Sequence, residues 1–176
     1  MKQENTKQKI IETALTLFSE RGYDAVSVGE IAAAVGIKAP SLYNHFPSKQ
    51  SIFDAIVETT ALQYEKDTDR IDIHVQSAAA DVPMLMTIGD EELFEKVRQI
   101  FDYSLHNDNI RKFRKMMTIE QFRSPALGEL YTRRFSERLV DYHAEVFRSL
   151  IAAGVIRGGD TNALALMYVA PVITLI

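Results

Sequence analysis

The sequence predicts an all-helical fold, and three observations support this prediction. Apolar residues recur at the three-to-four-residue spacing of one helix face, in long segments along most of the chain. The five prolines and eight glycines fall mostly between these segments. No segment shows a competing strand pattern. The chain of 176 residues is long enough for one good core, or for a small module joined to a larger one.

The first predicted helix begins near Asn5 or Thr6, since either side chain can cap a helix N-terminus. Gly22 ends it, because glycine tolerates the left-handed conformation that commonly follows a helix. The apolar face of this helix consists of Ile10, Ile11, Ala14, Leu17 and Phe18.

The second predicted helix opens with the letters SVGE, which form a capping box. In this motif the Ser27 side chain accepts from the Glu30 amide, and the Glu30 side chain accepts from the Ser27 amide. The following IAAAV is rich in small residues that let a neighbouring helix approach closely. Gly36 ends the helix after about three turns or fewer.

A third helix is expected to start a few residues later, with Pro40 in its first turn, where the missing amide hydrogen is not needed. Leu42 and Phe46 lie one turn apart and can share a buried face. Pro47 ends the helix, and Ser48 can cap a fourth helix that runs to about Lys66.

The rest of the chain predicts further helices around one irregular segment. Periodicity fades over residues 66–90, where a loop or irregular helix is expected. The following helices are expected at residues 90–105, 110–122, 126–153 and 161–176. The last of these is apolar and still helical in pattern at the final residue, which suggests truncation or burial against another surface.

Composition narrows the class of protein. There are no cysteines, which excludes disulfides and thiolate chemistry and fits a reducing compartment. The first ten residues lack the apolar stretch of a signal peptide, and no run of 18 apolar residues occurs, so we expect a cytoplasmic protein without a membrane partner. Residues 1–50 hold six basic and five acidic residues and the remainder holds 14 and 19, a difference in the direction expected if the N-terminal part meets a polyanion.

No enzyme signature is present. The sequence lacks GxSxG, GxGxxG and a phosphate-binding GK[ST], so we expect neither an enzyme nor a cofactor. His106 and His143 do not stand at metal-ligand spacing from another ligand, so no metal site is expected. Two alternatives stay open: a helical protein that binds small molecules without DNA, and a small helical enzyme.

The first three helices together predict a helix-turn-helix module. Such a module needs a short second helix of small residues, a tight turn and a third helix that is anchored by one or two large apolar residues. Its remaining side chains, polar and small, point outward. Residues 27–46 meet these requirements, and the third helix could then lie in a DNA major groove.

The segment SVGEIAAAVGIKAPSLYNHFPSKQSIF resembles the helix-turn-helix signature of the TetR family of transcriptional regulators. The resemblance covers roughly residues 7–56. The matching positions are Ser27, Ile31, Ala32, Gly36, Ile37, Leu42, Tyr43, Phe46, Lys49 and Phe53. It implies a homodimer that binds a palindromic operator and is released by a small ligand, with a DNA-binding domain at residues 1–47 and a ligand-binding, dimerising helical bundle at 48–176.

The resemblance also implies which residues touch DNA. Base edges would face Lys38, Ala39, Pro40 and Ser41; phosphates would be held by Ser27, Tyr43, His45 and Lys49; Asn44 could do either. Side-chain chemistry agrees, because lysine can donate to guanine and small apolar groups can touch a thymine methyl. The recognition helix has no arginine or glutamine, so much of the specificity is expected from apolar contacts, water or DNA shape.

Aromatic, methionine and histidine residues in the C-terminal part form a candidate pocket for a small, largely apolar ligand. Residues at helical spacing are core by default. The candidates are Phe101, Tyr103, His106, Phe113, Met116, Met117, Phe122, Tyr142, His143 and Tyr168. The helices at 126–153 and 161–176 carry more apolar surface than one core-facing stripe needs, which predicts that they form the dimer interface.

Overall fold

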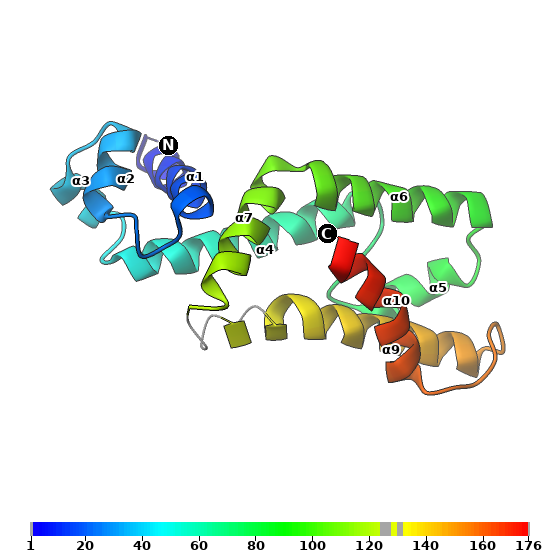
Figure 1. The fold of residues 1–176 in the computed structure, drawn as a ribbon. Coiled ribbons are helices and arrows are strands. Elements are labelled where there is room, and N and C mark those ends of the chain that lie inside the picture. Colours follow the sequence, from blue (N-terminus) through cyan, green and yellow to red (C-terminus); the bar gives the residue numbers. More distant parts are fainter. Residues whose placement is uncertain (1, 124–127, 130–131, 176) are drawn as a thin grey trace. The chain divides into compact units, whose positions relative to one another are not determined.

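The computed structural model describes residues 2–123, 128–129 and 132–175, and all of the regular structure in these ranges is helical (Figure 1). This confirms the predicted fold class. The elements are α1 (Lys2–Arg21), α2 (Val28–Val35), α3 (Ala39–Tyr43), α4 (Lys49–Asp69), α5 (Ala78–Leu85), α6 (Asp90–His106), α7 (Asp108–Glu120), the π-helical η1 (Thr132–Glu137), α9 (Arg138–Ala152) and α10 (Thr161–Leu175).

The chain divides into two compact units. The N-terminal unit comprises Met1–Leu62 and His106–Gly128, and the second unit comprises Gln63–Leu105 and Glu129–Ile176. The division falls within α4, and it places α7 with the first three helices. The predicted domains, 1–47 and 48–176, follow the helix-turn-helix motif and not the packing, and they stay a prediction.

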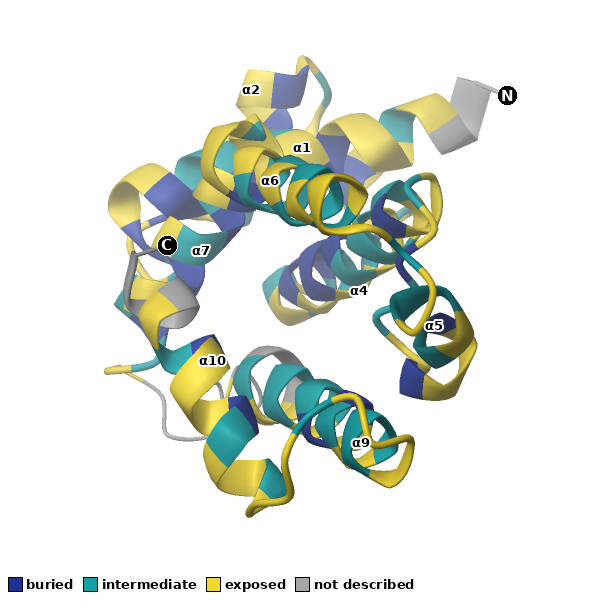
Figure 2. Cartoon of the chain, turned by 90° about the vertical axis from the view of Figure 1, so that its right-hand side faces the viewer, coloured by how far each residue is buried: buried dark blue, intermediate teal, exposed yellow. Residues whose placement is uncertain are grey.

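The N-terminal unit has a dense apolar core. Phe18 of α1 and Phe53 of α4 are fully buried, and their ring centroids lie 6.4 Å apart. Tyr23 joins them, 5.3 Å from Phe18 and 5.4 Å from Phe53. Helix α7 adds Met116 and Met117, both with no exposed surface, and packs against α1. Figure 2 shows buried turns on α1, α4 and α7, which explains why α7 belongs to this unit.

The second unit contains a helix whose bounds the sequence pattern did not predict. Helix α5 spans Ala78–Leu85 within the segment expected to be a loop or irregular helix. Pro83 lies inside it, and Ser77 at its N-cap makes no side-chain capping bond. Local signals for a helix are therefore weak. Tertiary contacts supply the missing stabilisation, since Asp81 of α5 is buried and hydrogen-bonded.

The long helix expected at residues 126–153 is not uniform where the structure describes it. Residues Thr132–Glu137 are π-helical, and regular α-helix follows from Arg138 to Ala152. Residues 126, 127, 130 and 131 of the expected helix lie outside the described residues. Gly154, which follows the C-cap residue Ala153 of α9, has φ +73°, as the predicted glycine stop requires.

Helix α10 packs on α9, and Ala165 and Val169 of α10 are buried. Leu166, Met167 and Tyr168 of the same helix are exposed. None of the described helices is long and apolar enough to span a membrane.

Candidate nucleic-acid interface

The capping box predicted at the start of α2 is present. The Glu30 amide donates to Ser27 Oγ at 3.2 Å, and the Ser27 amide donates to the Glu30 carboxylate at 2.8 Å. The Ser27 hydroxyl also donates to Glu30, at 2.8 Å. These bonds from the Ser27 backbone and side chain, followed by one from Arg21, lower the pKa of Glu30 to about 2. The Ser27 hydroxyl is already engaged with Glu30. A phosphate at this position would therefore be bound by the backbone amides at the N-terminus of α2.

A tight glycine turn joins α2 to α3. Gly36 has φ +85°, and its amide donates to the carbonyls of Ala32 and Ala33. The Ile37 amide closes the turn by donating to the Ala32 carbonyl at 2.9 Å. Lys38 is then extended, and its carbonyl accepts from Ser41 and Leu42, so α3 begins directly after it. Glycine is required here because a left-handed conformation strains other residues.

Helix α3 has one buried edge and a broad accessible surface. Leu42 and Phe46 anchor it in the core, as predicted. Tyr43 is 52% exposed, while His45 is partly exposed. None of the nine predicted DNA contacts is buried; they are Ser27, Lys38, Ala39, Pro40, Ser41, Tyr43, Asn44, His45 and Lys49.

Lys49 has contacts that the sequence pattern did not indicate. Its Nζ donates to the carbonyl of Tyr23 at 2.8 Å and to that of Val26 at 3.0 Å. The ammonium group also lies 4.1 Å from the centroid of the Tyr23 ring. Lys49 therefore ties the start of α4 to the loop that precedes Ser27, and one of its three N–H donors stays available for another acceptor.

Three basic residues of α1 that belong to no sequence motif also contribute to this region. Lys7 lies 5.4 Å from the Phe46 ring, and Lys9 donates to the Val35 carbonyl at 3.0 Å. Arg21 pairs with Glu30 at 2.8 Å. No local sequence pattern indicates these contacts, since the partners are distant in sequence or are backbone groups.

The ten candidate pocket residues do not fall in one unit. His106, Phe113, Met116, Met117 and Phe122 belong to the N-terminal unit, and the other five belong to the second unit. Phe113 and both methionines are buried core, whereas Phe122 is 84% exposed. In the second unit, the rings of Tyr103 and Tyr64 are tilted by 50° with their centroids 5.9 Å apart, while Phe101 is partly exposed.

Three of the candidates do come together in the second unit. The His143 ring lies 5.1 Å from Tyr142 and 4.8 Å from Tyr168. His143 Nδ1 is 2.8 Å from the Leu139 carbonyl, so Nδ1 carries the proton and Nε2 is left as an acceptor. Burial lowers the pKa of His143 and raises that of Tyr168, so both groups are neutral near pH 7.

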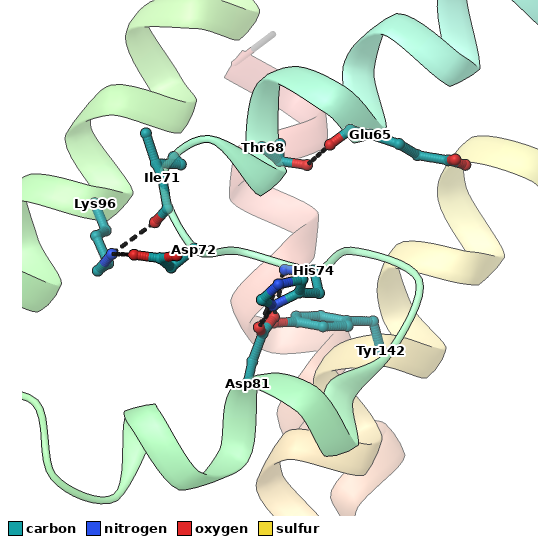
Figure 3. Close-up of polar contacts among 8 residues, drawn as sticks. All are labelled: Glu65, Thr68, Ile71, Asp72, His74, Asp81, Lys96 and Tyr142. Atoms are coloured by element: carbon teal, nitrogen blue, oxygen red, sulfur yellow. Dashed lines mark hydrogen bonds and ion pairs between the residues drawn. The ribbon is translucent and has the colours of Figure 1, made fainter.

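A polar cluster pins the loop between α4 and α5 (Figure 3). The side chain of Asp81 is fully buried, and it accepts the His74 amide at 2.9 Å, His74 Nδ1–H at 2.6 Å and the Tyr142 hydroxyl. Lys96 of α6 donates to the Ile71 carbonyl of the same loop at 2.6 Å. Burial, followed by the bond to Asp81, raises the pKa of Tyr142. These bonds give the cluster a structural role in the second unit.

No group of three or more histidine and acidic side chains among the described residues could hold a metal ion.

The capped helix, the glycine turn and the exposed third helix define a helix-turn-helix protein. Residues 10–56 match the model of the "Bacterial regulatory proteins, tetR family". This N-terminal segment is therefore similar to the helix-turn-helix domain of the TetR family, which is a family of transcriptional regulators.

Curated relatives match only the N-terminal part of the chain. The biofilm operon icaADBC HTH-type negative transcriptional regulator IcaR of Staphylococcus aureus strain Newman is 54% identical over 52 residues, which is 30% of this chain and 28% of the relative. IcaR of Staphylococcus epidermidis is 48% identical over 52 residues, with the same coverage. The match thus spans little more than a quarter of the length of these relatives.

Solved structures extend the likeness to the fold of nearly the whole chain. A TetR-family transcriptional regulator from Mesorhizobium loti is 25% identical, with a TM-score of 0.65 over 94% of this chain and 77% of that one. SmeT in complex with triclosan has a TM-score of 0.65, 23% identity and coverage of 96% and 77%. AibR with isovaleryl coenzyme A and operator DNA has a TM-score of 0.61, 21% identity and coverage of 94% and 82%.

Proposed function

We propose that this protein is a ligand-responsive transcriptional repressor, which binds a palindromic operator as a homodimer and is released by a small molecule. The observation that carries the proposal is the exposed, polar α3 held by a capped α2 and a glycine turn. The N-terminal segment that contains α2 and α3 is similar over 52 residues to a negative transcriptional regulator. We also infer a cytoplasmic location, where the DNA lies, and no catalytic activity.

In this proposal α3 enters the major groove. Lys38 donates to a guanine edge, and Ala39, Pro40 and Ser41 face neighbouring bases. Phosphates are held by Tyr43, His45, Lys49 and the N-terminus of α2 at Ser27, while Asn44 faces either a base or a phosphate. The accessibility of all these side chains supports the assignment.

Dimerisation through α9 and α10 fits the apolar surface of α10. Met167 is 74% exposed, and Leu166 and Tyr168 are also exposed. Exposed apolar side chains on α10 favour association with a second copy. The two DNA-binding domains of the dimer would then lie about 34–36 Å apart, which is one turn of DNA, so that they enter successive major grooves.

The ligand would act by favouring a dimer in which the two DNA-binding domains have a different separation. Its effect is limited by the difference in its affinity for the DNA-binding and the released state. The group formed by Tyr142, His143 and Tyr168 supports a site in the second unit, because it combines aromatic surface with neutral polar atoms. The solved structure of SmeT in complex with triclosan supports a small organic ligand as the class.

Selection of bound duplexes from genomic fragments, with purified protein at moderate salt, tests the proposal. We expect enrichment of an inverted repeat. Lys38→Ala should weaken binding to that repeat about 5- to 100-fold, by loss of one base contact. Lys115→Ala is the matched control, because Lys115 is an exposed lysine of α7 outside the helix-turn-helix.

No enrichment by a folded, dimeric sample, with or without a metabolite library, would refute DNA regulation. Binding of a metabolite by such a sample would then favour a small-molecule-binding protein without DNA function. Turnover of the bound compound would instead indicate an enzyme.

A further inference from the structure

A buried carboxyl group from α7 reaches the end of α1. Glu120, the last residue of α7, is only 2% exposed. Its Oε1 accepts the backbone amide of Tyr23 at 2.8 Å, across 97 residues of sequence. Arg123 Nη1 lies 3.7 Å from the same oxygen. The bond joins α7 to the first residues of the loop between α1 and α2, within the N-terminal unit.

Gly22 makes this approach possible. It has φ +83°, and a Cβ at this position would lie 2.6 Å from Arg123 Nη1 and 3.3 Å from Glu120 Oε1. The glycine thus serves both the left-handed turn after α1 and the close passage of two side chains from the α7 end. A larger residue would force these side chains away from the loop.

Further hydrogen bonds connect this contact with the predicted DNA interface. The Tyr23 amide is held by Glu120, and the Tyr23 carbonyl is held by Lys49. Lys49 also holds the carbonyl of Val26, the residue directly before Ser27, the N-cap of α2. A continuous set of hydrogen bonds therefore runs from α7 through the loop to the start of α2.

Stability alone would not favour an acid at this position. Burial of a carboxylate is costly, and the C-terminal end of a helix carries partial negative charge that disfavours a second negative group. An apolar side chain would avoid that cost but would leave the Tyr23 amide without this acceptor. The acid does provide a directional acceptor for one defined amide, which fixes the position of the loop.

We propose that Glu120 is a positioning residue for operator binding, which sets the N-terminus of α2 and the helix-turn-helix in a fixed place on α7. The inference rests on the proposed function. Helix α7 follows α6 after the single residue Asn107, so α7 is one of the covalent connections between the N-terminal unit and the second unit. A helix-turn-helix that is not held in place on α7 would lose its fixed separation from the helix-turn-helix of the second protomer.

Three variants and three measurements test this role on the full chain. Glu120→Ala removes the acceptor, Glu120→Gln keeps an acceptor oxygen, and Asp108→Asn is the control, because Asp108 is an exposed acid of the same helix paired with Lys112. The measurements are hydrogen exchange of the Tyr23 amide, thermal unfolding, and affinity for the selected operator against a version with one base pair inserted at its centre.

We expect Glu120→Ala to speed exchange at Tyr23 and to weaken operator binding about tenfold, equal to about 1.4 kcal/mol. It should also reduce the preference for the natural spacing over the longer one. Glu120→Gln should stay within about threefold of the wild type, and Asp108→Asn should match it. If Glu120→Ala does not fold, Glu120→Asp, which withdraws the carboxyl group by one methylene, takes its place.

The preference for the natural operator spacing is the decisive measurement, because substitution of a purely structural residue would lower stability without changing that preference. Unchanged discrimination between the two operators in the folded variant would overturn the inference, even if its melting temperature falls. Wild-type protein that binds no duplex would instead refute the proposed function, and the inference would fail with it.

Discussion

Replacement of Lys49 by methionine separates two roles that one side chain could have. Methionine keeps most of the apolar stem and removes the ammonium group. The change deletes the bonds to the Tyr23 and Val26 carbonyls and the contact with the Tyr23 ring. If the third N–H also holds a phosphate, the change affects DNA binding as well as folding.

The contacts set the expected magnitudes. Each bond from a charged donor contributes about 1.5–3 kcal/mol, and an exposed cation–ring contact about 0.5–1 kcal/mol. Lys49 is partly exposed, so water can replace some of these bonds, and we expect a loss of about 2–3 kcal/mol. At about 2–4 °C per kcal/mol, the melting temperature should fall by about 4–12 °C. Loss of two phosphate contacts per dimer should flatten the slope of log K against log salt by about 1.8.

Denaturant unfolding and salt titration of operator binding measure the two effects separately. The control is Lys66→Met, in the last turn of the same helix, where the lysine is exposed. Unchanged unfolding would refute the role of Lys49 in holding the loop. Lower stability with an unchanged salt slope would withdraw the phosphate contact and leave Lys49 as a residue that only shapes the interface.

Three further predictions concern the turn, the second unit and the dimer. Gly36→Ala should destabilise by about 1 kcal/mol in denaturant unfolding, through backbone strain alone, because nothing lies within 4 Å of the added Cβ; an unchanged midpoint would contradict this. The bond to Asp81 raises the pKa of His74 above 6.5, so its stabilisation should be full below pH 6.5 and lost as the pH rises through the higher folded-state value. His74→Gln should remove that dependence from thermal unfolding scans between pH 5.5 and 8.5, and an equal dependence in the variant would refute the assignment. Met167→Glu should shift micromolar protein from dimer toward monomer in sedimentation, because a charge replaces an exposed apolar contact; a wild type that is only monomeric would disprove the interface.

Elements with local signals could be predicted from the sequence, whereas those held by distant contacts could not. The capping box at Ser27 and Glu30 spans three residues, and the stop at Gly36 needs one glycine, so both were predicted where they occur. Helix α5 depends on the bonds of Asp81 with His74 and Tyr142. Tyr142 is 61 residues away, and no local pattern indicates such a partner.

The same distinction applies to the candidate interface. The exposure of α3 follows from the two anchors Leu42 and Phe46, which are one turn apart in the sequence. The contacts of Lys49 are with backbone carbonyls, which every residue carries and no sequence pattern identifies. A motif could therefore indicate that Lys49 belongs to the module, but not which atoms it holds.

The side chains of α3 make the exact positions of the phosphate-binding residues especially important for the specificity of this protein. In the proposed interface Lys38 is the only long hydrogen-bond donor of the recognition helix, so few direct base contacts contribute to specificity. Discrimination must then depend more on DNA shape and on phosphate contacts, which report the geometry of the duplex rather than its bases. Such contacts are selective only if their donors are held at fixed separations. We therefore expect substitutions that loosen the loop before α2, through Lys49 or Glu120, to reduce sequence discrimination as strongly as substitutions on α3 itself.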